Sequence, residues 1–219
     1  MQILEQLGLG LGLATLAGLN LYLTVFLTGL LVRFDVLHLA AKYQTIEVLG
    51  HDWVLIAAGV LYAIEFVADK VPWLDSLWDS IHTLIRPVGG TLLAMQALGE
   101  MPAHLEVVAA LLAGGAALTT HSAKAGTRLL ANHSPEPASN IALSIAEDIV
   151  VVAGTLIMVL KPIIALCIFT AVIIVLWLVL PRMFRVIRRS FEIIRDKLRI
   201  LFGRNTPDYS VTPPGSSRA

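Results

Sequence analysis

The chain has few charged residues and almost no cysteine, and these two shortages already exclude several classes of protein. Only 15% of its 219 residues are charged, whereas a soluble domain carries about 25%. Hydrophobic residues make up 57%, and the mean hydropathy is +0.78. One globule of this size cannot bury so much apolar surface, so a soluble enzyme is nearly excluded and an integral membrane protein is expected. The single cysteine, Cys167, excludes an intramolecular disulfide.

The N-terminus lacks the basic start and the cleavage pattern of a removable signal peptide, so none is expected. The formal net charge of zero hides an asymmetry, because residues 1–181 contain 7 Lys and Arg against 13 Asp and Glu, and residues 182–219 contain 9 against 3. Basic residues that flank membrane segments stay in the cytoplasm, so this asymmetry predicts a cytoplasmic C-terminus. Four of these residues are expected to contact anionic lipid headgroups: Arg182, Arg185, Arg188 and Arg189.

Apolar runs predict an all-α, multi-pass membrane protein with five or six membrane segments. A spanning helix needs about 20 mostly apolar residues. Residues 7–32 satisfy this length, residues 141–180 suffice for two helices, and residues 53–67 and 105–118 each begin another. Residues 87–98 are apolar but too short to span, so this segment is expected to be broken or re-entrant. The side of the N-terminus depends on whether five or six segments cross, and it stays open.

The sequence divides into three parts. Residues 1–181 form the integral membrane domain, 182–204 a cytoplasmic basic amphipathic helix, and 205–219 a disordered tail rich in Pro, Ser and Gly. Within the membrane domain the two halves echo one another, since each contains a basic-proline pair, Arg86-Pro87 or Lys161-Pro162, before an apolar segment. These echoes fit an inverted repeat of three plus three segments, an arrangement found in many transporters.

Charged side chains within apolar segments are costly unless they are paired or solvated, so their positions indicate candidate sites. Between residues 72 and 86, polar side chains recur at spacings of four, three and four, which places them on one helix face opposite an aromatic face. This acidic stripe consists of Asp75, Asp79, His82 and Arg86. The stripe either faces a water-filled cavity or is the solvated face of a helix lying on the membrane surface.

A second stripe is basic. It consists of His121, Lys124, Arg128 and Asn132, and the last three recur every four residues. On a helix that begins near residue 105, these side chains either bind an anion along a pore or simply face water at the helix end, where cations are favoured.

Four further acids are candidate proton-coupling groups, because a buried carboxyl can titrate near neutral pH. They are Glu65, Asp69, Glu147 and Asp148. Adjacent helical residues point about 100° apart, so Glu147 and Asp148 cannot both face lipid cheaply, and at least one should face the protein interior. Alternatively, both lie at the interfacial end of their helix.

Several polar blocks accompany these stripes. They are Gly18-Leu-Asn20-Leu-Tyr22, Ala68-Asp69-Lys70-Val-Pro72 with the acidic stripe behind it, His121-Ser-Ala-Lys124-Ala125 with Arg128, Asn140, and Glu147-Asp148. Together they resemble a bacterial multi-pass membrane family known as domain of unknown function 4126, over about residues 8–170. The resemblance implies a multi-pass helical protein of the bacterial cytoplasmic membrane, and it names no substrate.

The function expected from these features is a small transporter or channel for an ion or a small anionic substrate. Proton coupling is also expected, through a cavity between the acidic and basic stripes. One alternative is a metal-dependent membrane enzyme acting on a lipid phosphate, although the usual motifs of such enzymes are missing and a non-enzyme is favoured. Another is a structural or lipid-organising protein. The sequence identifies no cofactor or metal, nucleic acid is not expected as a partner, and homo-oligomerisation stays open.

Overall fold

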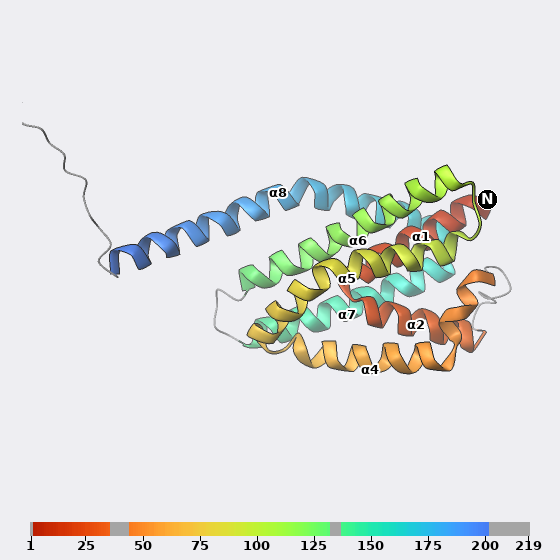
Figure 1. The fold of residues 1–219 in the computed structure, drawn as a ribbon, viewed down its shortest axis with the longest axis horizontal. Helices are drawn as coiled ribbons and strands as arrows, with labels where there is room; N and C mark the ends of the chain where they lie inside the picture. The colour runs from red at the N-terminus through yellow and green to blue at the C-terminus, as the bar shows by residue number, and fades with distance from the viewer. Residues whose placement is uncertain (1, 36–43, 132–136, 202–219) are drawn as a thin grey trace, which may run out of the picture.

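The computed structural model describes residues 2–35, 44–131 and 137–201, and the all-α expectation is confirmed there (Figure 1). Within these ranges the chain forms seven α-helices and one 3-10 helix. They are α1 (Gln2–Leu19), α2 (Leu21–Arg33), η1 (Gln44–Gly50), α4 (Asp52–Ala68), α5 (Pro72–Leu98), α6 (Ala103–Ala131), α7 (Pro137–Leu160) and α8 (Pro162–Leu201).

Length and composition identify the chain as a membrane protein. Three stretches in the described helices are long and apolar enough to cross a membrane, namely Ala103–Ala131, Ala138–Leu160 and Pro162–Arg189. Two shorter apolar helices, Ile3–Leu19 and Leu21–Arg33, accompany them. Only 11% of the most apolar window of α8 is buried inside the protein, so its outer face needs an apolar surrounding such as lipid.

The expected single helix over residues 7–32 is wrong, because the chain breaks at Asn20. This residue has an extended backbone with φ −147° and ψ 99°. Its side-chain Oδ1 accepts a hydrogen bond from the backbone N–H of Leu23 at 3.0 Å, which caps the start of α2. Asparagine is among the best helix N-caps, so the capping role of Asn20 explains the break. The polar pattern alone does not indicate this role.

The break expected near Arg86-Pro87 is also wrong, because α5 continues through Pro87. The following Gly89 and Gly90 pack closely, so that a Cβ at Gly90 would lie 2.7 Å from Ala117 Cβ of α6. These tight contacts directly after the proline help to compensate for the hydrogen bond that it removes. The halves therefore differ, since Lys161-Pro162 does separate α7 from α8.

Helices α1 and α2 form a helical hairpin whose two outer ends lie at the same end of the bundle (Figure 1). Gly10 of α1 packs against Leu98 at the end of α5. Gly29 of α2 packs against Leu49 of η1, and the Thr45 hydroxyl of η1 donates to the Gln96 carbonyl oxygen of α5. We call this the N-terminal end of the bundle, and the end with residues 68–72, 131 and 137 the far end.

The tip of the hairpin, residues 18–21, lies inside the bundle. A Cβ at Gly18 would collide with Thr120 Oγ1 and the Ala117 carbonyl oxygen of α6. Helix α1 contacts α5, α6, α7 and α8, so it occupies the centre of the bundle. Glycine at position 18 therefore permits the close approach of α1 to α6.

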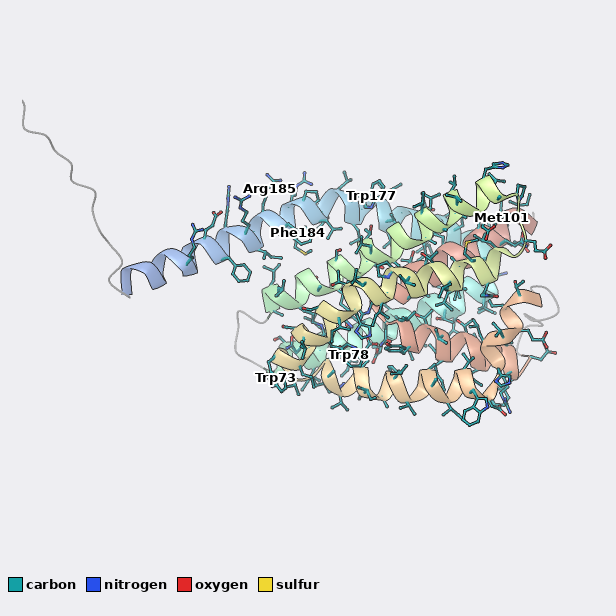
Figure 2. The ribbon with its side chains drawn as sticks, in the orientation of Figure 1. Trp73, Trp78, Met101, Trp177, Phe184 and Arg185 are labelled. Carbon is teal, nitrogen blue, oxygen red and sulfur yellow. The ribbon has the colours of Figure 1, made fainter. Side chains whose placement is uncertain are left out.

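Helices α4 to α8 run between the two ends, and α8 extends beyond the far end to Leu201 (Figures 1 and 2). Met183 and Ile187 of α8 pack near Gly126 of α6, close to the far end. The helix is continuous through Pro181, so the expected boundary between residues 181 and 182 falls within it. The tail expected to be disordered, 205–219, lies outside the described residues.

Candidate functional site

A buried ionic network occupies the half of the bundle next to the far end. Eight charged side chains from α4 to α7 and the C-cap of α4 take part, five of them carboxylates and three of them cations. They are Glu65, Asp69, Asp75, Asp79, Glu147, Arg86, Lys124 and Arg128. Seven of these residues are at most 5% exposed, and the Glu147 side chain is 13% exposed. The network is therefore shielded from solvent.

Lys124 of α6 connects three carboxylates. Its Nζ lies 3.4 Å from Glu65 Oε1, 3.1 Å from Asp69 Oδ2 and 3.2 Å from Glu147 Oε2. This single ammonium thereby joins α6 to the end of α4 and to the middle of α7.

Arg128, one helical turn further along α6, makes the most contacts. Its Nη2 and Nε donate to the two oxygens of Glu147 at 2.7 and 3.3 Å, which is the two-pronged geometry that suits a guanidinium. It also donates to the backbone and side chain of Asp69, at 2.8 and 3.2 Å, and lies 3.4 Å from Asp75 Oδ1. Arg128 thus joins four helices, α4, α5, α6 and α7.

Arg86 connects the network to the hairpin tip. Its Nη2 donates to Glu65 Oε1 at 2.6 Å, and its Nη1 donates to the Gly18 carbonyl oxygen at 3.2 Å. Asp79 Oδ1 lies 3.5 Å away. The last carbonyls of a helix attract cations, so the end of α1 is a favourable place for this guanidinium.

Both predicted histidines border the network. Arg86 Nη1 approaches His121 Nδ1 at 2.9 Å, and because arginine only donates, Nδ1 accepts and the proton is on Nε2, next to the Asp79 carbonyl oxygen at 3.1 Å. His82 Nδ1 donates to the Trp78 carbonyl oxygen at 2.8 Å, and its Nε2 accepts from the Tyr22 hydroxyl at 3.0 Å. Each ring is therefore fixed in one tautomer.

The neighbouring acids of α7 face different partners. Glu147 belongs to the network, whereas Asp148 faces the hairpin tip. Asn20 Nδ2 donates to Asp148 Oδ1 at 3.1 Å, and the Tyr62 hydroxyl donates to Oδ2 at 3.1 Å. Both acids therefore face the protein interior, whereas the sequence required this of only one.

The network has more carboxylates than cations, five against three. Neither oxygen of Asp75 or of Asp79 accepts a hydrogen bond in the described part of the chain, and Glu65 Oε2 and Asp69 Oδ1 are also without one. Buried ionised carboxylates without partners cost several kcal/mol, of the order of the penalty per ion in protein interiors. The arrangement therefore favours binding of protons or of a cation.

A fourth cation lies close by but does not balance this excess. Lys70, in the turn between α4 and α5, donates to the Phe66 carbonyl oxygen at 2.7 Å and lies over the Phe66 ring. Within the described ranges it makes no ion pair with the network. Partial burial lowers the pKa of its ammonium, and the carboxylates of Asp148 and Asp69 offset this only in part.

A cavity of about 250 Å³ lies between α5 and α6, and Asp75 and Asp79 of the acidic stripe and Arg128 of the basic stripe line it. The cavity is lined by Asp75, Ser76, Asp79, Ser80, Thr83, Ala125, Arg128 and Leu129. The spacing of the residues predicts one polar face on each helix, but it indicates neither that these faces meet nor that the cations are already paired.

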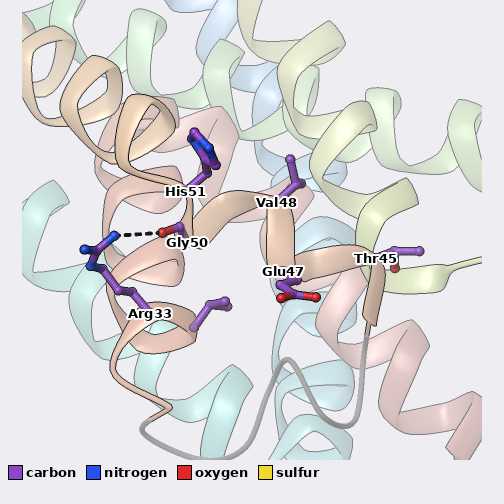
Figure 3. Close-up of a pocket in the computed structure, with 7 residues that line it drawn as sticks. Arg33, Thr45, Glu47, Val48, Gly50 and His51 are labelled. Atoms are coloured by element: carbon purple, nitrogen blue, oxygen red, sulfur yellow. Dashed lines mark hydrogen bonds between the residues drawn. The ribbon is translucent and has the colours of Figure 1, made fainter.

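A larger cavity of about 580 Å³ lies at the N-terminal end and contains no network residue (Figure 3). It is lined by Val32, Arg33, Thr45, Glu47, Val48, Gly50 and His51. Arg33 donates to the Gly50 carbonyl oxygen at 3.4 Å and pairs with the exposed Asp52. Surface ion pairs of this kind contribute little, so this cavity has weaker electrostatic features than the buried site.

The remaining expected site residues lie apart from the network. Asn132 lies outside the described residues. Arg182, Arg185, Arg188 and Arg189 are exposed on α8 near and beyond the far end, where Figure 2 shows Arg185, and Arg188 pairs with Glu192 at 3.0 Å. Their contact with lipid headgroups stays a prediction. Among the described residues, no group of three or more His, Cys, Asp or Glu side chains is arranged to hold a metal ion.

Sequence reasoning missed some of the polar partners. Tyr62 was not considered, although one tyrosine hydroxyl within an apolar helix needs a partner when it is buried. Tyr22 and Asn20 are predicted only as parts of the polar block Gly18 to Tyr22. Their pairing with His82 and Asp148 depends on which helices are neighbours.

The comparisons with known proteins identify a family and name no activity. A family model described as domain of unknown function (DUF4126) matches residues 7–182. No curated protein and no solved structure matches the chain significantly. The match covers α1 from residue 7, all of α2, the ionic network and α8 as far as residue 182.

Proposed function

Since the chain belongs to the family described as domain of unknown function (DUF4126), a description that names no activity, we propose its function from the geometry of its site. The protein is a small proton-coupled ion transporter of the bacterial cytoplasmic membrane. The buried ionic network is the part that couples proton binding to helix movement. Transport, coupling and compartment are all parts of this proposal.

The observation that carries the proposal is the excess of buried carboxylates in a network whose cations join several helices. Lys124 and Arg128 each contact carboxylates from α4 and α7, so a proton gained or lost by one carboxylate changes which helices are held together. A ligand shifts a conformational equilibrium only if it binds one state better than the other. Protonation of a paired carboxylate satisfies this condition, because it removes the charge that holds the cation.

The broken hairpin supports the same proposal. In many transporters, helices that end inside the membrane place their terminal dipoles at the binding site. Here α1 ends beside Arg86, which binds the Gly18 carbonyl oxygen, and α2 begins at Asn20, which binds Asp148. Movement of the network therefore acts directly on the hairpin tip.

The positions of the basic residues suggest how the bundle lies in the membrane. The exposed arginines of α8 follow the segment Pro162–Arg189 at and beyond the far end, so by the positive-inside rule that end faces the cytoplasm. Five helices, α4 to α8, run between the ends, and the hairpin enters from the N-terminal end without crossing. In the proposed orientation the N-terminus is outside and the ionic network lies in the cytoplasmic half of the bundle.

The test is ion-dependent proton movement in liposomes that contain the purified full-length chain and a lumenal pH dye. We expect Asp79→Asn and Lys124→Gln to abolish movement while both variants still insert into the membrane. Glu106→Gln is the matched control, because Glu106 is exposed on α6 near the N-terminal end. Full proton movement by both network variants would contradict the proposal.

A structural role is the second candidate, and the completeness of the ion pairing favours it. Each cation of the network already has at least two carboxylates within 4 Å and is at most 3% exposed. If the pairs only hold helices together, exchanging the partners in Arg128→Glu with Glu147→Arg preserves function. If the network couples transport, the exchanged pair inserts but does not move protons.

A further inference from the structure

We propose that the cavity between α5 and α6 binds a monovalent cation, with the carboxylates of Asp75 and Asp79 as its charged ligands. This inference rests on the proposed transport function, and it names the class of ion on which that function acts. The sequence analysis expects either an ion or a small anionic substrate, and this inference favours a cation.

Two buried carboxylates line this cavity with unused oxygens. Asp75 is 0% exposed and Asp79 is 5% exposed. Within the described ranges none of their four carboxylate oxygens accepts a hydrogen bond. Both side chains line the cavity, so their unsatisfied oxygens are available to an occupant. Arg128 and Arg86 lie within ion-pair distance of these carboxylates but do not satisfy their hydrogen-bonding capacity, which buried polar groups normally fill.

The hydroxyl groups beside them also present acceptors. Ser80 Oγ donates its proton to the Ser76 carbonyl oxygen at 2.7 Å, and Thr83 Oγ1 donates to the Asp79 carbonyl oxygen at 2.9 Å. Each hydroxyl oxygen has two lone pairs for accepting, and although Thr83 Oγ1 also lies 3.1 Å from His121 Nε2, both hydroxyls line the cavity with acceptor capacity left. A wall of carboxylate and hydroxyl oxygens suits a cation better than an anion.

The cations that border the site are already engaged. Arg128 also lines the cavity, but its shorter contacts are with Glu147 at 2.7 Å and Asp69 at 3.2 Å, against 3.4 Å to Asp75. Arg86 lies 3.5 Å from Asp79 and only 2.6 Å from Glu65. The two carboxylates of the cavity therefore have the longer ion pairs, which an incoming cation displaces most easily.

A single positive charge fits these surroundings best. Arg128 repels a divalent ion twice as strongly as a monovalent one, and no group of three acidic or histidine ligands exists among the described residues. A volume of about 250 Å³ holds a cation with several waters, since each water occupies about 30 Å³ in the liquid.

Cation binding also has a consequence for the hairpin. When a cation pairs with Asp79, the attraction between Asp79 and Arg86 weakens, and Arg86 is the residue that holds the Gly18 carbonyl oxygen at the hairpin tip. The occupied cavity therefore favours a different position of Arg86 from the empty one. This contact is a route from ion binding to movement of the broken helix.

The experiment is the thermal unfolding midpoint of the purified full-length chain in detergent, titrated with potassium, sodium or methylammonium chloride at constant ionic strength. A ligand that binds the folded state raises the midpoint in a saturable way. We expect such a rise with at least one of these cations. The alkali salts and the amine salt distinguish an inorganic ion from an organic ammonium as the ligand.

Asp79→Asn keeps the shape of the side chain and removes its charge, so half-saturation should require at least about tenfold more cation, as expected for losing an interaction with a charged group. Glu106→Gln should titrate like the unchanged chain. If Asp79→Asn does not fold, Ser80→Ala with Thr83→Val removes two acceptors without changing any charge, and the affinity should again fall.

Absence of a saturable rise with all three cations overturns the inference, and so does a rise that neither set of substitutions weakens. Failure of the transport proposal looks different. Saturable cation binding without proton movement in liposomes leaves the site intact and rejects transport, whereas proton movement without cation binding rejects the site and leaves transport standing.

Discussion

The two halves of the bundle share helices α4 to α7 but are held together by different forces. Near the N-terminal end, α1 packs through Leu9, Leu13 and Leu16, each at most 1% exposed, against residues such as Met158 and Phe169. Near the far end, charged side chains such as Lys124, Arg128 and Glu147 fill the space between the helices. Helix α7, for example, contributes Met158 to the apolar half and Glu147 to the ionic half.

The difference shows how each half limits movement. Within a membrane, apolar helix faces gain little by leaving lipid, so the apolar half depends on close van der Waals contact and small residues. The contacts of the ionic half are few and strong, and each depends on the charge of its partner. The apolar half therefore provides a fixed framework, and the ionic half is the one that protons or ions can rearrange.

The largest expected effect comes from breaking the ionic half. Arg128→Gln leaves Asp69, Asp75 and Glu147 without their shared partner and should lower the free energy of unfolding by about 3 to 5 kcal/mol, the usual cost of breaking a buried ion pair. Reversible unfolding in detergent measures it. Arg185→Gln on the exposed part of α8 is the control and should change stability little. An equal loss in both variants would contradict the division into halves.

A substitution that creates a cavity in the apolar half should lower the free energy of unfolding somewhat less. Leu13 is completely buried, and Leu13→Ala should cost about 2 to 5 kcal/mol, toward the lower end where the surrounding helices relax. The same unfolding measurement applies. Leu13 makes no polar contact with the network, so the cavity between α5 and α6 should bind a cation with unchanged affinity in this variant. A lost affinity would mean that the two halves are not independent.

The smallest of these effects concerns the hairpin tip, where the halves meet. Gly18→Ala places a methyl group against Thr120 Oγ1 and a backbone oxygen of α6, so an overpacking cost of about 1 to 3 kcal/mol is expected. Gly115→Ala is the matched control on α6, because a Cβ there has nothing within 4 Å. The thermal unfolding midpoint of Gly115→Ala should be higher than that of Gly18→Ala. Equal midpoints would show that the tip is not closely packed.

Much of the site could be predicted from helical spacing. The intervals of the acidic stripe place Asp75, Asp79, His82 and Arg86 on one face, and all four are buried in the structure. The same reasoning found Lys124 and Arg128 on one side of α6. Spacing did not reveal the break at Asn20, because an asparagine inside a long apolar run is compatible with a continuous helix until its side chain caps a backbone N–H.

The sequence by itself determined that this is a membrane protein and where its few charges lie along each helix. These properties depend on composition and on local periodicity, which act over a few residues. Only the tertiary structure decided which charges meet, since Lys124 reaches Glu65 across 59 positions and Asn20 reaches Asp148 across 128. The energy of an ion pair depends on the distance between its atoms, and helix packing sets that distance.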